Sequence, residues 1–336
     1  MSKIKYLRFL FGLFIFFSVF SFSSHALAAT IITDDIMENT TWTLNNSPYV
    51  VKNNILVWPD TILTIEPGVV VKVAPNSGLG VWGSLSAEGT SENHIFFTSL
   101  WDDTIAGDTN GDGKKTVPVV SMWNQQGLFG GVYFDAAEGV SLNNVDISFS
   151  KNGFNFWSTS ASISNIKGRK NIHDLNVWEG SNVTLSGGDF FGSLYESVYL
   201  VDSILTGDHI TVDSTQNWQG FITFNSDLFL TDSLIQNSLK VQGMQGVGAE
   251  GPGTVNLERV TIKNIFQGVV GYEGVILNIK NSILDKSGVV TWGGAVANID
   301  NSVIQNGGSI VDYGNSIFNI TNNKIINNYI GVDIYA

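Results

Sequence analysis

The sequence predicts an all-β protein, a right-handed parallel β-helix: a solenoid of about a dozen coils. Short β-branched runs separated by Gly, Asn, Asp and Ser recur along the 336 residues, and no stretch sustains the apolar spacing of an amphipathic helix. One unit also repeats: an apolar anchor, a polar turn, and a second apolar residue five positions after the anchor. These two patterns run in step along the chain, which indicates stacked coils and not separate domains.

The repeat is clearest from Leu142 onward. Its later anchors are Ile163, Leu185, Leu205, Leu230, Leu257, Ile279, Ile299 and Ile320, at spacings of 21, 22, 20, 25, 27, 22, 20 and 21 residues. The residue five after the anchor is apolar in every coil except one, where it is Gly168. A coil of this length cannot bury its own apolar face, so we expect each coil to stack on its neighbours.

A turn column accompanies the anchors. Two residues after the anchor stand Asn144, Asn165, Gly187, Gly207, Asn281, Asn301 and Asn322. Asn and Gly adopt the left-handed backbone conformation more readily than other residues, so we expect the chain to turn at this column. The longest spacing contains the Gly-rich segment 243–253, which we predict to be a loop.

Residues 1–28 have the pattern of a cleavable signal peptide. A basic start precedes an apolar run at 9–22, and the small-x-small sequence Ala26-Leu27-Ala28 follows it. We expect residues 29–50, which carry no repeat, to cap the β-helix of residues 51–336, with an insertion at 100–118. The last coil ends at Ala336 without a polar cap, so we expect the chain to be a fragment with further domains beyond it; the alternative is a partner that covers this end.

Composition narrows the classes of partner. The net charge is −13, and removing the signal peptide makes it −16, so we expect no nucleic-acid binding and no membrane insertion of the mature chain. The same charge favours divalent cations. The chain contains no Cys, so burial and hydrogen-bonded ladders must stabilise an exported protein that has no disulfides.

The insertion carries a D-x-N-x-D-G segment, typical of a calcium loop. We expect Ca²⁺ to pin the insertion in a structural role; the alternative is an acidic surface turn that binds nothing. Position twelve is Val119, so the usual bidentate Glu is missing. The candidate ligands are Asp108, Asn110, Asp112, the carbonyl of Lys114, and Asp102 and Asp103 in place of the Glu.

Stacking turns sequence columns into spatial ladders, and two columns carry chemistry. Four residues after consecutive anchors stand Asp146, Lys167, Asp189 and His209, near Arg169 and Lys170. This outward column is either an acid–base set acting on a glycan, with the nearby cations holding an acidic sugar, or a surface salt-bridge ladder. We favour the ladder, because surface charge pairs are common.

The second column is aromatic, and it lies thirteen to fifteen residues after the anchors. It contains Trp157, Trp178, Tyr199, Trp218, Tyr272, Trp292, Tyr313 and Tyr335, with Met244 in the one coil that lacks a ring. Facing outward, these rings would suit sugar rings or a partner surface. We predict that they face inward as a core stack, because large aromatic side chains usually bury most of their area.

Several segments resemble a known family. Thr64-Ile65-Glu66-Pro67-Gly68-Val69, the stretch 279–288 and the stretch 320–328 are similar to bacterial secreted proteins of the right-handed parallel β-helix repeat type, the pectate-lyase-like solenoids. The resemblance implies the fold over nearly the whole mature chain. It implies little about function, because such proteins include polysaccharide lyases, glycoside hydrolases, adhesins and surface proteins.

Two functions follow as hypotheses. The first is a non-enzymatic, secreted or cell-surface stalk, adhesin or carbohydrate-binding module whose partner is a polysaccharide or cell-surface glycan. We favour it because the sequence shows no Gly-His-Gly or Arg-x-Lys motif and no dense Asp cluster on neighbouring coils. The alternative is a polysaccharide lyase or glycoside hydrolase that uses the column from Asp146 to His209.

Overall fold

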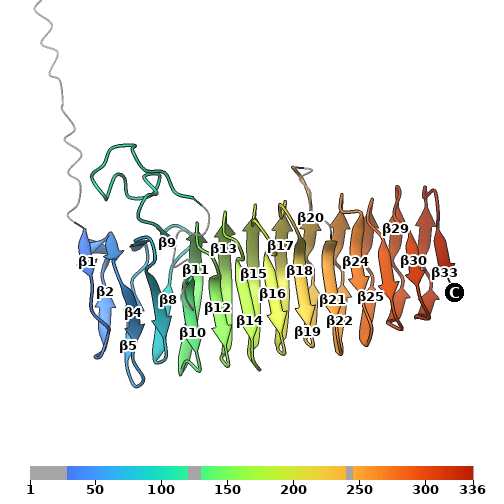
Figure 1. Cartoon of the computed structure of the whole chain (residues 1–336), viewed down its shortest axis with the longest axis horizontal. Helices are drawn as coiled ribbons and strands as arrows, with labels where there is room; N and C mark the ends of the chain where they lie inside the picture. The colour runs from blue at the N-terminus through green and yellow to red at the C-terminus, as the bar shows by residue number, and fades with distance from the viewer. Residues whose placement is uncertain (1–28, 120–129, 240–244, 336) are drawn as a thin grey trace, which may run out of the picture.

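The computed structural model describes residues 29–119, 130–239 and 245–335. The chain winds into a parallel β-solenoid of about 13 turns, which confirms the predicted fold class. Its coils follow one another along a straight rod in chain order (Figure 1). The predicted signal peptide, Met244 and Ala336 lie outside the described residues.

Two parallel sheets form the walls of the rod, one of 21 strands and one of 12. The first contains β1 (Thr30–Ile32), β2 (Thr40–Trp42), β3 (Tyr49–Val51), β5 (Ile62–Ile65), β6 (Val70–Val73), β8 (Ser84–Glu88), β9 (Ile95–Ser99), β11 (Gly139–Ser148), β13 (Ser160–Arg169), β15 (Asn182–Phe191), β17 (Ile204–Asp213), β19 (Asp227–Thr231), β20 (Leu234–Gln236), β22 (Gly253–Glu258), β23 (Thr261–Lys263), β25 (Val275–Lys280), β26 (Ile283–Asp285), β28 (Val296–Asp300), β29 (Val303–Gln305), β31 (Ile317–Thr321) and β32 (Lys324–Ile326). The second contains β4 (Asn54–Val57), β7 (Gly78–Val81), β10 (Gly131–Asp135), β12 (Gly153–Trp157), β14 (Leu175–Trp178), β16 (Val198–Val201), β18 (Gln219–Phe224), β21 (Gln245–Glu250), β24 (Gln267–Gly271), β27 (Val289–Trp292), β30 (Ile310–Tyr313) and β33 (Val332–Tyr335). A single 3₁₀ turn, η1 (Leu44–Asn46), accompanies them in the described chain.

The core is a set of apolar rows that run along the rod. Phe154 and Phe156 of β12 are fully buried, and Phe156 stacks on Phe134 of the preceding coil with ring centroids 4.7 Å apart. Side chains alternate across each strand, so the residues between these face away from the core. Burial along continuous rows therefore stabilises each coil through the coils on either side.

The predicted turn column is confirmed at its Asn positions. Asn144, Asn165 and Asn281 have φ values of 49°, 51° and 52°, and Gly187 has 76°. A residue with a Cβ is strained in this left-handed conformation, and Asn tolerates it best. In the next coil, however, the left-handed residue is His209, with φ of 54°, and not Gly207.

The prediction was wrong at Gly207 because the anchor of that coil was misplaced. Gly207 pairs with Leu185 on one side and with Leu230 on the other, so it occupies the anchor row itself. A Cβ on Gly207 would lie 2.7 Å from Cδ2 of Leu230, which shows that the neighbouring side chain fills its space. Leu205, two residues earlier, pairs with Val183.

Residues 29–50, predicted as a cap, contribute a coil of their own. β1 pairs with β3 and β2 pairs with β5, both in parallel, and Ile36 forms a bridge to Val57. The first described segment therefore continues the solenoid. No helix in the described ranges has the length and apolar character needed to cross a membrane.

The insertion leaves the rod after β9 and stands out from its side (Figure 1). It carries no strand over 100–119. Its base is held by Lys72 of β6, which is 0% exposed and whose Nζ donates to the carbonyls of Asp102 (2.9 Å) and Gly107 (2.7 Å). A buried ammonium group thus satisfies two carbonyls of a segment that has no strand of its own.

Candidate functional site

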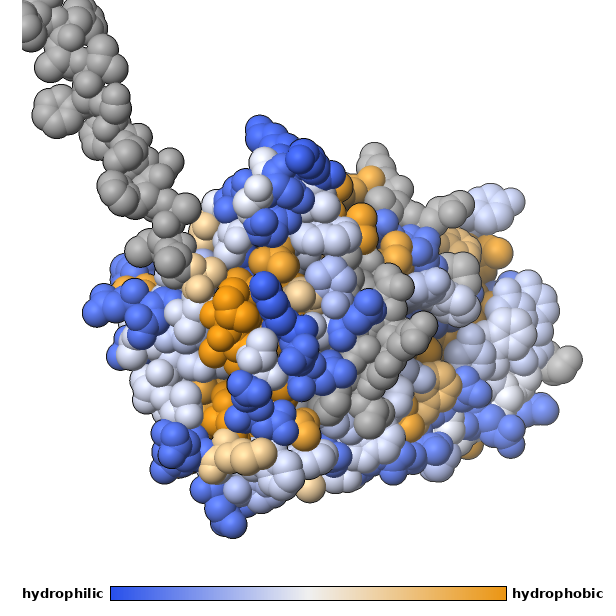
Figure 2. Space-filling model, turned by 60° about the vertical axis from the view of Figure 1, so that its left-hand side comes forward, coloured by the Kyte–Doolittle hydropathy of each residue, from blue (hydrophilic) through white to orange (hydrophobic). Residues whose placement is uncertain are grey.

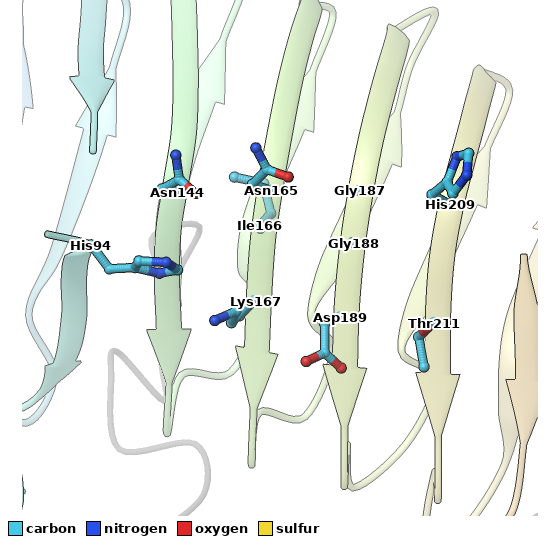
Figure 3. A pocket seen from close by; sticks show the side chains of 10 residues that line it. All are labelled: His94, Asn144, Asn165, Ile166, Lys167, Gly187, Gly188, Asp189, His209 and Thr211. Carbon is cyan, nitrogen blue, oxygen red and sulfur yellow. The ribbon is translucent and has the colours of Figure 1, made fainter. Parts of the chain in front are cut away.

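A cleft of about 420 Å³ lies on the outer face of the larger sheet, across β11, β13, β15 and β17. Figure 3 shows its side chains rising from consecutive strands, with the imidazole of His94 reaching over from the segment before β9. The cleft is hollow at its centre because Gly187 has no side chain at the turn position that Asn165 and His209 occupy in the neighbouring coils. Its lining residues are His94, Asn144, Asn165, Ile166, Lys167, Gly187, Gly188, Asp189, His209 and Thr211.

Three of the four predicted column residues stand side by side in this region. Asp146 pairs with Lys167, and Lys167 pairs with Asp189, in register across three strands. Adjacent parallel strands lie about 4.8 Å apart, so these side chains are close neighbours. They project from the solvent-facing side of the sheet, as the sequence predicted.

His209 does not belong to this column. The residue in register with Asp189 is Thr211, because the misplaced anchor at Leu205 shifted the count by two. His209 stands at the rim of the cleft with its side chain 70% exposed, and its Nδ1 lies 2.7 Å from Asp208 Oδ2. The hydrogen bond to Asp208 raises the pKa of His209.

His94 is the residue that the column search missed. Its Nδ1 lies 2.8 Å from Asp146 Oδ1, and both side chains are largely buried. If Nδ1 donates to the carboxylate, Nε2 is left as the acceptor, which is the tautomer a general base requires. His94 lies in a coil before the clear anchors, so counting residues from an anchor did not reach it.

The cations of the cleft differ in their partners. Arg169 is paired with the carboxylate of Asp189, and Nζ of Lys170 lies 5.4 Å from the centroid of the Phe149 ring. Lys167 forms no ion pair with any described residue. No ion pair among the described residues joins two members of the predicted column: Asp146 pairs with His94, Asp189 with Arg169 and His209 with Asp208.

The aromatic column faces outward, so the predicted inward stack was wrong. In β12 and β14 the inner rows hold Phe156 and Val177, while Trp157 and Trp178 lie on the other side of the strand and are partly exposed. Farther along, Trp292 and Tyr313 are 38% and 44% exposed. Large rings face solvent here because smaller apolar side chains already fill the inner rows.

The rings also do not form one continuous row. Trp157 pairs with Trp178, but the next residue in register is Val201; Tyr199 pairs with Asn176 in the adjacent outward row. Trp218 precedes β18 and is exposed, and Tyr272 follows β24. On the face shown in Figure 2, apolar residues form narrow patches between hydrophilic ones.

The predicted calcium loop has a defined shape. Asp108 accepts hydrogen bonds from the backbone N–H groups of Gly111 (2.8 Å) and Gly113 (2.8 Å), which curl the loop around its carboxylate. Asn110 Nδ2 lies 3.0 Å from Asp112 Oδ2, so these two side chains share one side of the loop. Lys114 is exposed at its end.

Asp102 and Asp103 do not complete a ligand set. Asp102 is buried and accepts hydrogen bonds from the hydroxyls of Thr98 (2.7 Å) and Thr104 (2.5 Å). Oδ1 of Asp103 is buried without a hydrogen-bond partner. Across the described residues, no three His, Asp or Glu side chains gather as a metal site.

No family model and no curated protein matches the sequence. Among solved structures, the chain is similar to the catalytic domain of Agl-KA, with 11% identity and a TM-score of 0.40. That match covers 91% of this chain and 62% of the other, so the chain spans less than two thirds of the Agl-KA chain. It is also similar to the A-module of the mannuronan C-5 epimerase AlgE4 of Azotobacter vinelandii, with 11% identity and a TM-score of 0.31, over 93% of this chain and 90% of that one. Both likenesses are too distant to bear on function.

Proposed function

We propose that the protein is an exported glycan-recognition β-helix and that its cleft binds an acidic polysaccharide. The proposal rests on the position of Lys167 and on its lack of an ion-pair partner. Its ammonium group lies in a cleft, without an ion pair among the described residues, on a protein whose net charge is −13. The carboxylates on either side of it, Asp146 and Asp189, are engaged by His94 and Arg169, so a carboxylated sugar supplies an anion that can pair with Lys167 directly.

The rest of the cleft suits a sugar chain. Amide groups of Asn144 and Asn165 line the cleft, and amides both donate and accept hydrogen bonds with hydroxyl groups. Gly187 leaves room for a ring between its neighbours. The cleft also crosses several coils, so a polymer can lie along the rod and contact more than one coil at once.

A glycan-array screen tests this function. The protein without residues 1–28 is applied to acidic and neutral oligosaccharides, and bound material is assayed separately for new reducing ends. We expect binding to uronate-containing chains and weaker binding at higher salt, because a charge pair at an exposed site is screened. Failure to bind any acidic glycan contradicts the proposal.

A second candidate function is a polysaccharide lyase, and the His94–Asp146 pair favours it. The pair lies beside Lys167, so a uronate whose carboxylate meets Lys167 would present its α-proton to Nε2 of His94. In β-elimination His94 would take that proton, the C4–C5 double bond would form, and the C4–O bond would break, with the released oxygen taking a proton from water. The neighbouring ammonium group would stabilise the charge that develops on the carboxylate. The hydrolase alternative would use Asp189, which is already paired with Arg169.

Turnover separates the two candidates. A lyase releases an unsaturated product that absorbs ultraviolet light, and a hydrolase releases only reducing ends. For the lyase we expect His94→Ala to abolish turnover while binding persists, because Lys167 is unchanged. The variants Asp189→Ala and His209→Ala test the original column; neither should abolish elimination. Binding without any turnover by the unaltered protein leaves recognition as the function.

We also propose that Ca²⁺ binds the loop at 108–114. The curled backbone around Asp108 and the shared side of Asn110 and Asp112 support an oxygen-ligand set of the kind Ca²⁺ prefers. Its role is structural, because the loop belongs to the insertion and none of its residues lines the cleft.

A further inference from the structure

A second cleft, of about 640 Å³, lies at the corner where the smaller sheet turns into the larger one. It follows the turns after β21, β24 and β27, several coils away from the cleft around Lys167. Gly274 and Gly293 help to keep it open, because a Cβ at either position would meet no atom closer than 3.4 Å, whereas the Cβ position of Gly251 is filled by the side chain of Asn225. Its remaining lining residues are Glu250, Pro252, Tyr272, Glu273 and Trp292.

The aromatic wall of this cleft is rigid. Trp292 stacks on Tyr313 of the next coil, with ring centroids 4.2 Å apart and an angle of 22° between the planes. Tyr313 in turn stacks on Tyr335 at 5.3 Å. Trp292 is the first ring of this stack, so its indole borders the cleft while the rings behind hold it in place. The hydroxyl of Tyr272 is anchored 3.4 Å from Nε2 of Gln245.

The second cleft is negatively charged, whereas Lys167 brings a positive charge to the first cleft. Glu250 and Glu273 are both exposed, and neither carboxylate forms an ion pair with a described residue. No Lys, Arg or His lines the cleft. Two carboxylates beside an indole and a phenol form a site for a cation, because the ring faces attract positive charge and the carboxylates accept its hydrogen bonds.

We propose that this cleft binds a protonated amino sugar within a glycan chain. The amine donates to Glu250 and Glu273, and the C–H face of the pyranose packs against Trp292. A sugar ring that combines an apolar C–H face with a positive charge uses both features of the site, whereas a free metal ion uses only the carboxylates. The site does not depend on the function proposed for the cleft around Lys167.

Titration calorimetry with oligomers of glucosamine tests the proposal, with N-acetylglucosamine oligomers and spermidine as comparison probes. We expect the glucosamine oligomer to bind, the acetylated oligomer to bind at least about tenfold more weakly because it lacks the charge, and spermidine to bind weakly because it lacks the ring. Equal binding of both sugars contradicts the role of the charge. Equal binding of spermidine and glucosamine contradicts the role of the sugar ring.

Variants locate the site on a protein that is acidic overall. Trp292→Ala leaves the net charge unchanged, and we expect at least about tenfold weaker binding. The double variant Glu250→Gln and Glu273→Gln should weaken binding similarly, whereas the matched double control Glu38→Gln and Glu92→Gln removes two exposed charges elsewhere and should not. Thermal melting establishes that each variant folds. Unchanged affinity in the Trp292 variant overturns the assignment.

Discussion

Gly168 and Asp174 share one space inside the solenoid: a Cβ on Gly168 would overlap the carboxyl group of Asp174. Gly168 stands in an inner row between Ile147 and Phe190, so both neighbouring coils have an apolar side chain at this position. The carboxyl group of Asp174 fills the space that the missing side chain leaves. It accepts hydrogen bonds from Ser193 and from Asn171 (2.7 Å).

Asp174 should make stability depend on pH. Burial raises its pKa to about 6, against hydrogen bonds from Ser193 and Asn171 that lower it. The folded protein therefore holds this proton more tightly than the unfolded chain. The resulting stability is fully present below about pH 4 and is lost as the pH rises through about 6, a change of roughly 3 kcal/mol.

Urea unfolding at about pH 4.5 and pH 7.5 measures this contribution. Asp174→Asn should remove that loss of stability between the two pH values. Asp213→Asn is the control: burial is the largest influence on Asp213, but hydrogen bonds from Ser214 and Ser238 outweigh it and lower the pKa. Its contribution is lost only at lower pH. Identical pH profiles for the wild type and Asp174→Asn would show that Asp174 carries no such proton.

Gly168→Ala should destabilise the fold by about 1 to 3 kcal/mol, because the added methyl group and the Asp174 carboxyl group cannot both fit. In an Asp174→Ala background the same change should cost much less, and a double-mutant cycle measures that coupling. Gly331→Ala is the control, since its Cβ would meet nothing closer than 3.5 Å. If the two changes in the free energy of unfolding simply add, Gly168 and Asp174 do not compete for one space.

Lys72→Met should loosen the insertion. The Met side chain matches Lys as far as Cε and lacks only the amino group, so the carbonyls of Asp102 and Gly107 lose their donor, at a cost of about 1 to 3 kcal/mol each. Limited proteolysis should then cut within 100–119 faster than in the wild type. The exposed Lys52→Met serves as the control. Unchanged cleavage in the Lys72 variant would mean that other contacts hold the insertion.

Calcium should raise the melting temperature if it binds the loop, because a ligand that binds only the folded state stabilises it. A chelator should reverse the rise, and Asp108→Ala should abolish it. Glu66→Ala, away from the loop, should respond to calcium as the wild type does. If neither calcium nor chelator changes the melting temperature, the loop does not bind a structural calcium ion.

The sequence predicted the coils well because their turns need Asn or Gly and their inner rows need apolar residues. The prediction of the anchor residue failed in the coil where a glycine stands in an inner row. Gly207 stood where an anchor was expected, so the count moved to Leu205 and placed His209 beside Asp189. His94 was missed because its contact with Asp146 joins residues 52 positions apart, outside any repeat.

The direction in which the aromatic rings point could not be predicted from the sequence. Their spacing along the chain was visible, but spacing alone does not tell which side of a strand faces the core. The inner rows are already filled by residues such as Phe156 and Val177, and this decided the outward direction of Trp157 and Trp178. The large rings therefore lie on the surface of the solenoid, and two of them, Tyr272 and Trp292, line the second cleft.

Acidic-glycan binding at the first cleft depends on the charge of Lys167. Titration calorimetry of an oligogalacturonate into the wild type, Lys167→Gln and the control Lys280→Gln compares the loss of the same charge on the same sheet. We expect binding that weakens with salt, an affinity at least about tenfold lower in Lys167→Gln, and little change in Lys280→Gln. Equal affinity in the two variants, or no binding by the wild type, would contradict an acidic-glycan cleft at this position.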